Sequence, residues 1–166
     1  MRALPVPETS PPILFGHPAP PGDLLPWTWA LRRLSEARNY WIATTRAGGQ
    51  PHTRPVWGVW LVDGFWFSTG SLARHNLASD ERISVHLEGG DEAVIVEGVA
   101  HPVTDPAALE PMCDAYNPKY GWSMRPSGDG VTDADGNAGP AFRVAPRVVF
   151  GWQAEMGSPT RWCFSA

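Results

Sequence analysis

Residues 52–77 hold the side chains whose types and spacing are best suited to chemistry. Arg54 and Arg74 lie toward opposite ends of this segment, with the hydroxyls of Ser68 and Thr69 between them. Guanidinium groups and hydroxyls bind phosphate and carboxylate oxygens through charge-assisted hydrogen bonds. The combination suits an anionic ligand, and a phosphorylated ligand with a planar ring would also use the aromatic residues nearby.

The same segment predicts a strand, a hairpin, a second strand and a short helix. Residues 52–62 are predicted as the first strand, and Asp63-Gly64 is the strongest short hairpin signal in the chain. The hairpin folds the two ends of the segment back toward each other. The two arginines are therefore expected on the same side of a paired-strand platform.

A helix start is predicted after the second strand. Gly70 lets the backbone approach a ligand closely, and Ser71 is a suitable N-cap for a helix over residues 72–79. The free N–H groups of a helix start favour an anion. The helix dipole disfavours a cation such as Arg74 in the first turn unless an anion is bound nearby. An exposed arginine on a surface helix is the alternative interpretation.

The first predicted strand is apolar on both of its faces. Alternation places Val56 and Trp60 on one face, and Trp57 and Val59 on the other. One face must fill the core, so the other is predicted to meet a partner subunit or a ligand. Gly58, in the middle of the strand, predicts a bulge or a point of close approach.

Further patterns predict a mainly β fold with peripheral helices. Tight turns connect most strands, so the sheet is predicted to be largely antiparallel and to close into a barrel. A helix is predicted from Pro106 to about Tyr116, ended by Asn117-Pro118, and residues 125–139 are predicted as a polar, glycine-rich loop. The remaining predictions are a helix over 27–38 and strands over 40–46, 82–87, 93–100, 142–145, 147–153 and 160–164.

The composition indicates one domain preceded by an arm. The chain has 166 residues, 43% of them hydrophobic, which is enough for a real core. Its net charge is −4, whereas nucleic-acid-binding proteins typically carry an excess of basic residues, so no nucleic-acid partner is expected. Residues 1–24 are rich in proline and are predicted as an extended arm, followed by a single domain over 25–166.

Membrane, secretion and metal signals are weak. No apolar run approaches the roughly 20 residues needed to span a bilayer, and no signal-peptide pattern is present, so a cytoplasmic protein is expected. Cys113 and Cys163 lie far apart and in no ligand-like spacing. They indicate neither a disulfide framework nor a zinc site, and no metal is expected.

Three motifs, in this order, resemble those of a known family. They are Thr53-Arg54-Pro55-Val56, Phe67-Ser68-Thr69 and Ala73-Arg74-His75-Asn76-Leu77, and the likeness extends over about residues 27–105. The combination resembles the flavin/deazaflavin oxidoreductases of the pyridoxamine 5′-phosphate oxidase-like split barrel, and within them the actinobacterial branch. The resemblance implies a Greek-key antiparallel split β-barrel that forms a homodimer, with cofactor sites between the subunits.

The resemblance also implies a cofactor and the residues that bind it. FMN and the deazaflavin coenzyme F420 both remain open, whereas FAD and haem, which other branches bind, are less expected. The implied function is hydride transfer between the cofactor and a small organic substrate. The residues implied for cofactor binding are Arg54, Pro55, Val56, Trp57, Ser68, Thr69, Arg74 and Asn76.

The substrate side is defined less well by the sequence. The candidates are His52, Trp152, Arg161 and Trp162. For each of them, a packing or surface role is the alternative.

Two other functions remain open. A non-catalytic split barrel that stores or carries flavin or haem would use the same residues without turnover. An unrelated small β-barrel with a protein-binding role would use its nine tryptophans and the proline-rich arm as an interface.

Overall fold

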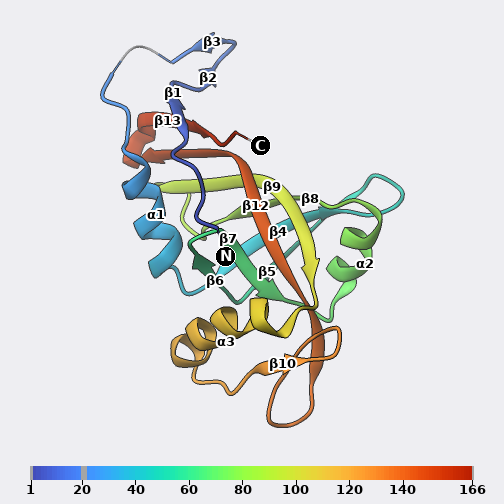
Figure 1. The fold of residues 1–166 in the computed structure, drawn as a ribbon. Helices are drawn as coiled ribbons and strands as arrows, with labels where there is room; N and C mark the ends of the chain where they lie inside the picture. Colours follow the sequence, from blue (N-terminus) through green and yellow to red (C-terminus); the bar gives the residue numbers. More distant parts are fainter. Residues whose placement is uncertain (1, 20–21, 166) are drawn as a thin grey trace.

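One antiparallel sheet forms the greater part of the molecule (Figure 1). The computed structural model describes residues 2–19 and 22–165, and 11 strands of this part belong to one sheet. The prediction of a mainly β, antiparallel fold with peripheral helices is confirmed. No helix within the described ranges is both long and apolar enough to cross a bilayer. The elements are β1 (Glu8–Ser10), β2 (Ile13–Leu14), β3 (His17–Pro18), α1 (Trp27–Glu36), β4 (Tyr40–Thr45), β5 (Pro51–Val56), β6 (Gly58–Leu61), β7 (Gly64–Ser68), α2 (Leu72–Ser79), β8 (Arg82–His86), β9 (Ala93–Val103), α3 (Pro106–Tyr120), β10 (Arg125–Ser127), β11 (Gly130–Thr132), β12 (Ala138–Gln153), a 3₁₀ turn (Ala154–Met156) and β13 (Gly157–Cys163).

The sheet is organised around β12. This strand pairs with β9 along most of its length, from Ala141 opposite Val103 to Trp152 opposite Ala93. Its first half also pairs with β7, and its second half pairs with β13 instead. One long strand therefore joins the barrel wall to the edge that carries the N-terminal arm.

The barrel is interrupted between β5 and β6. β5 pairs with β4, whereas β6 pairs with β7, and only Trp57 separates the two strands along the chain. The path β7–β12–β9–β8–β4–β5 therefore returns to its start through the covalent chain at Trp57, not through a hydrogen-bonded ladder. The single strand predicted over residues 52–62 is two strands with a break.

Gly58 makes this break possible. A β-carbon at this position would lie 2.4 Å from the Phe65 ring and 2.6 Å from the carbonyl oxygen of Trp66. Any side chain larger than hydrogen would displace the facing strand β7. The prediction that Gly58 is a point of close approach is confirmed.

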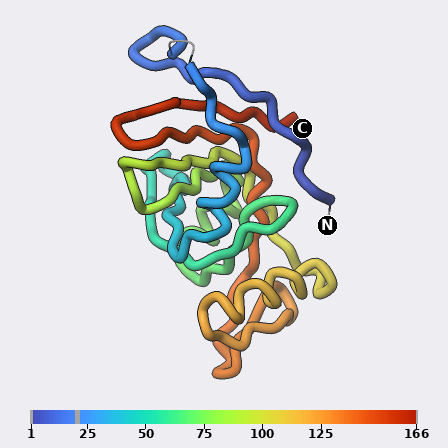
Figure 2. The backbone as a smooth tube through the Cα atoms, turned by 90° about the vertical axis from the view of Figure 1, so that its left-hand side faces the viewer, coloured from blue at the N-terminus to red at the C-terminus, as the bar shows by residue number. Residues whose placement is uncertain are grey.

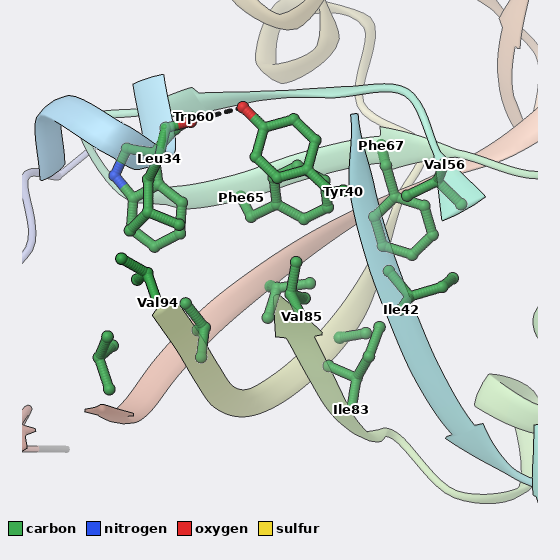
Figure 3. Packing of buried hydrophobic residues seen from close by; sticks show 14 of the residues in the cluster. Leu34, Tyr40, Ile42, Val56, Trp60, Phe65, Phe67, Ile83, Val85 and Val94 are labelled. Carbon is green, nitrogen blue, oxygen red and sulfur yellow. Dashed lines mark hydrogen bonds between the residues drawn. The ribbon is translucent and has the colours of Figure 1, made fainter. Parts of the chain in front are cut away.

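Aromatic and aliphatic side chains fill the barrel (Figure 3). Tyr40 and Phe65 pack with their ring centroids 4.5 Å apart, and Phe67 stacks on Phe65 at 5.6 Å. The Tyr40 hydroxyl donates to the carbonyl oxygen of Leu34 at 2.5 Å, which ties α1 to the barrel. Burial raises the pKa of Tyr40 above its ordinary value, which favours the protonated hydroxyl still further.

The outer face of β6 is covered by α3, which corrects one inference from the sequence. Val59 and Trp66 lie in a second buried cluster together with Leu109 and Met112 of α3. The second apolar face of this strand therefore packs within the same chain. Its hydrophobicity is not a signal of a partner subunit.

α3 runs one turn further than the sequence indicated. Pro118 lies inside the helix, which continues to Tyr120 and ends at Gly121 in the left-handed conformation, with φ 70°. The carbonyl group that this proline leaves without a donor belongs to Asp114, which is exposed, so water can satisfy it. Burial of the Tyr120 ring favours the extra turn, and the predicted end at Asn117-Pro118 was wrong.

Residues 125–139 form a hairpin in place of the predicted loop. β10 pairs with β11, and β11 pairs with β12. The turn that follows is closed by Asp133, whose carboxylate accepts hydrogen bonds from the N–H groups of Asp135 and Asn137, both at 2.9 Å. Polar and glycine-rich composition is typical of both loops and tight turns, which is why the short strands escaped prediction.

The N-terminal arm lies along the last strand (Figure 2). β1 pairs with β13, with Thr9 opposite Trp162, and the Leu4 amide donates to the Val62 carbonyl at 2.9 Å. β2 and β3 then form a small hairpin beyond the sheet. Backbone hydrogen bonds therefore hold the first part of the arm on the body of the molecule.

We expect Gly58→Ala to lower the free energy of unfolding by about 1–3 kcal/mol, because the added methyl group overpacks the break. Gly48→Ala is the matched control, since no atom lies within 4 Å of its added carbon. The control should stay within about 0.5 kcal/mol of the wild type. Denaturant unfolding measures both, and a Gly58→Ala variant as stable as wild type would contradict this account of the break.

Candidate functional site

A pocket of about 370 Å³ lies where the end of β5, the end of β7 and the start of α2 meet. It brings together predicted ligand residues from the end of β5 and the end of β7, because the β6–β7 hairpin returns the chain from Gly58 to Phe67. Asn39, Gly70, Ser71 and Tyr116 complete the lining. The predicted residues that line it are Arg54, Pro55, Val56, Trp57, Ser68 and Thr69.

Arg54 supplies the positive charge of the pocket. It lies on β5 opposite Ile42, and its Nε is 3.4 Å from the carbonyl oxygen of Pro55. None of the ion pairs within residues 2–19 and 22–165 involves Arg54. A guanidinium group that no carboxylate neutralises is suited to bind an anion.

Hydroxyl groups and a helix start line the other side of the pocket, next to Ser68. The Thr69 Oγ1 and Ser71 Oγ atoms lie 2.8 Å apart. Ser71 caps α2 by accepting from the N–H group of Ala73, as predicted. No atom lies within 4 Å of where a β-carbon of Gly70 would be, so the backbone is open to the pocket there.

Trp57 provides a flat aromatic wall. Its ring stacks on Tyr120 of α3, with centroids 4.9 Å apart and planes inclined by 9°. The Arg38 guanidinium carbon lies 5.8 Å from the Trp57 ring centroid. These contacts restrain the ring at the break in the barrel, where it can stack on a planar ligand.

The last turn of α3 holds the backbone at this break. The Tyr120 hydroxyl accepts from the Gly58 N–H at 3.0 Å and lies 2.8 Å and 2.6 Å from the carbonyl oxygens of Gly58 and Arg38. Lys119 Nζ donates to the Gly58 carbonyl and to the Tyr40 hydroxyl, both at 3.0 Å. Burial, aided by the charge of Arg38, lowers the pKa of Lys119 to about 8.

Lys119 and Tyr120 were not predicted as functional residues from the sequence. Because Pro118 was interpreted as the end of the helix, both residues were assigned to the following segment. The spacing of Tyr116 and Tyr120, four residues apart and followed by Gly121, was the signal that could have extended the helix.

Two residues predicted for cofactor binding lie outside the lining of the pocket. Arg74 is exposed on α2, with its Nε 3.3 Å from Nε2 of His75. Asn76 is buried and donates to Thr44 Oγ1 at 2.9 Å, so it holds α2 against β4. The pocket is therefore lined by Arg54 and not by Arg74.

Three of the predicted substrate residues lie away from the pocket. His52 is opposite Thr44 in the β4–β5 ladder, and its Nδ1 is 3.5 Å from Thr44 Oγ1. Trp152 lies near the end of β12, where its Nε1 donates to the Gly90 carbonyl at 3.2 Å. Arg161 lies on β13. None of the three is among the lining residues.

The fourth candidate, Trp162, is a core residue. None of its surface is exposed, and it packs against Trp27 and Trp29 at centroid distances of 5.7 Å and 6.5 Å. Packing is the alternative that the sequence left open for this residue.

The chain matches a known family, and the match covers the elements that form the barrel and the pocket. A family model described as pyridoxamine 5′-phosphate oxidase matches residues 30–153, which span the barrel from α1 to β12. The chain belongs to this family. The split-barrel resemblance inferred from the motifs is thus confirmed. No curated protein matches the chain.

Solved structures share the fold of this pyridoxamine 5′-phosphate oxidase family member. The conserved hypothetical protein Rv2991 from Mycobacterium tuberculosis is 24% identical, with 80% of this chain and 88% of that chain covered and a TM-score of 0.65. An F420 reductase is 22% identical, with 71% and 94% covered and a TM-score of 0.50. The haem storage protein HutZ from Vibrio cholerae is 18% identical, with 74% and 89% covered and a TM-score of 0.55.

The low pKa of Lys119 gives a pH dependence of stability. Between about pH 8 and the ordinary lysine pKa of 10.5, the unfolded chain holds the proton that the folded chain has lost. The free energy of unfolding of the wild type, minus that of Lys119→Met, should therefore rise with pH across this window. Denaturant unfolding of both proteins at several pH values measures the difference, in which shared tyrosine titrations cancel. A difference that falls or stays flat would contradict the burial of this ammonium group.

Proposed function

We propose that this protein is an oxidoreductase that binds a flavin or deazaflavin cofactor in the pocket at β5, β7 and α2. The observation that carries the proposal is that Arg54, the hydroxyls of Ser68 and Thr69, and the Trp57 ring line one pocket. The guanidinium and hydroxyl groups suit a phosphate, and the flat ring suits a conjugated ring system. The residues present therefore fit a phosphorylated planar group.

The protein's part in such a reaction is binding and orientation. Arg54 and the hydroxyls of Ser68 and Thr69 fix the phosphate end, and the start of α2 adds the favourable dipole of its N-terminus. Trp57 orients the ring and excludes water from one of its faces. When bound, the cofactor supplies the hydride chemistry.

We favour FMN or F420 over haem as the bound group. An F420 reductase and a haem storage protein are both similar in fold, so the fold alone does not discriminate. Haem binding commonly uses an axial side chain such as histidine. The residues that line the pocket, all within the described ranges, include no histidine.

A homodimer is part of the proposal. The outer face of β4, β8 and β9 surrounds a hollow of about 540 Å³, and none of the three α-helices described lines it. On this face Trp41 stacks on His86, and Pro55 lies opposite Trp41 in the ladder. Because Pro55 also lines the pocket, a second copy on this face would lie next to the cofactor.

Replacing Arg54 tests the phosphate site. We expect Arg54→Ala to weaken FMN binding about 10–100-fold, because a charge-assisted contact is lost. The affinity of Arg54→Lys should lie between those of Arg54→Ala and the wild type. Arg46→Ala, at an exposed arginine outside the pocket, is the matched control and should bind as wild type does. FMN fluorescence quenching measures the affinities, with F420 titrated in parallel. Equal binding by Arg54→Ala and wild type would place the phosphate elsewhere.

Ala43→Arg tests the dimer. Ala43 lies on the outer face between Thr53 and Ser84, so an arginine there would obstruct a second copy. Wild type should sediment as a dimer, and the variant should sediment as a folded monomer with weaker cofactor binding. A monomeric wild type would argue against the shared site.

Turnover of the bound cofactor distinguishes the proposed enzyme from a non-catalytic carrier. A carrier would bind the cofactor yet leave it unchanged with every electron donor and acceptor, whereas the proposed enzyme would turn over with at least one pair.

A further inference from the structure

A second hollow, of about 230 Å³, continues the cofactor pocket under the β10–β11 hairpin. The two hollows share Ser68, Thr69, Gly70 and Tyr116 as lining residues. The end of β7 is therefore a common wall, and a molecule in one hollow lies next to a molecule in the other.

Aromatic and apolar side chains form one part of the wall of the second hollow, and polar side chains form the rest. Tyr116, Met124 and Val131 are buried lining residues, and Trp122, 44% exposed, stands at the rim. The Trp122 ring meets the Trp57 ring edge-on, with centroids 5.8 Å apart and planes at 85°. Aromatic surface thus continues from the cofactor pocket into the second hollow, which suits a planar ligand.

The two hollows differ in charge. Arg54 lines the cofactor pocket, whereas Asp133 is the one charged residue among the described residues that line the second hollow. Arg125 reaches the backbone oxygen of Asp133 from outside this lining, at 3.5 Å. An ionised carboxylate in the wall disfavours an anionic ligand. The Asp133 oxygens already accept three hydrogen bonds within their own turn, so they are not free to pair with a cation, and the second hollow suits an uncharged ligand.

The second hollow is preformed. The Asn117 side chain donates to the Met124 carbonyl at 2.9 Å and accepts from the Met124 N–H group at 2.7 Å. The Asn137 side chain donates to the Asp133 carboxylate at 2.8 Å. At Gly139 a β-carbon would lie 3.1 Å from Ser68 Oγ, so glycine keeps the shared wall clear.

We propose that this second hollow is the substrate subsite of the proposed enzyme, and that it takes an uncharged, planar organic molecule stacked against Trp122. The assignment rests on the proposed function, because it places the substrate next to a cofactor held at Arg54. It replaces the predicted substrate residues His52, Trp152, Arg161 and Trp162, which lie elsewhere.

The test uses 2-naphthol as an uncharged planar probe and naphthalene-2-sulfonate as its anionic counterpart. Equilibrium dialysis against the full chain measures the affinity of each, with and without saturating FMN. We expect wild type to bind 2-naphthol more tightly than the sulfonate and to keep that affinity when FMN is bound. Trp122→Ala should weaken 2-naphthol binding about tenfold, and Trp122→Phe should restore most of it.

Phe15→Ala is the matched control, since Phe15 is an aromatic residue 95% exposed on the distant β2–β3 hairpin. It should bind the probe as wild type does. Binding that ignores Trp122, prefers the sulfonate or is displaced by FMN would overturn the subsite. If FMN binds and 2-naphthol does not, the subsite alone fails. If FMN does not bind, the proposed function fails, and with it the assignment of the hollow to its substrate.

Discussion

The hydrogen bonds between Gly58 and the last turn of α3 determine how this barrel is closed and where its pocket lies. Between β5 and β6 the wall has no ladder, and the Tyr120 hydroxyl and the Lys119 ammonium group take over the backbone groups of Gly58. The close approach of Gly58 to Phe65 leaves no room for a side chain. Without these contacts the break would be an edge open to water, and the neighbouring Trp57 ring would lose its support.

A single chain reversal therefore serves both stability and binding. The β6–β7 hairpin returns the chain from Trp57 to Ser68, so that a guanidinium group on β5 and hydroxyls at the end of β7 line one pocket. α3 and the hairpin that follows it then cover one side of this region and create the second hollow. The cationic pocket and the second hollow share a wall, an arrangement that allows two ligands of different charge to lie in contact.

Local signals in the sequence were enough to predict most of the fold. Ser71 predicted the start of α2, Pro106 that of α3, and Gly58 the close approach, because capping and backbone sterics act within a few residues. The predictions that were wrong concern features that depend on tertiary contacts. Burial of Tyr120 carries α3 past Pro118, and α3 covers Val59, which lies on the apolar face that was predicted to meet a partner subunit or a ligand.

The candidate site was predictable to the same extent. Arg54, Ser68 and Thr69, implied by the family motifs, line one pocket because the β6–β7 hairpin returns the chain to the end of β5. Arg74, which was favoured for its place in the first turn of the predicted helix, is exposed, and Asn76 donates to Thr44. Trp122 had no signal in the sequence, and the tyrosine spacing that extends α3 would have placed Lys119 on the helix without revealing its contacts, since both roles arise from packing between distant segments.

The most direct test of the account is gel filtration of the wild-type protein mixed separately with FMN and with F420, followed by the absorbance spectrum of the protein peak. The account predicts that at least one of the two cofactors elutes with the protein and shows a visible band shifted from that of the free compound. Elution of both cofactors apart from a folded protein would contradict it.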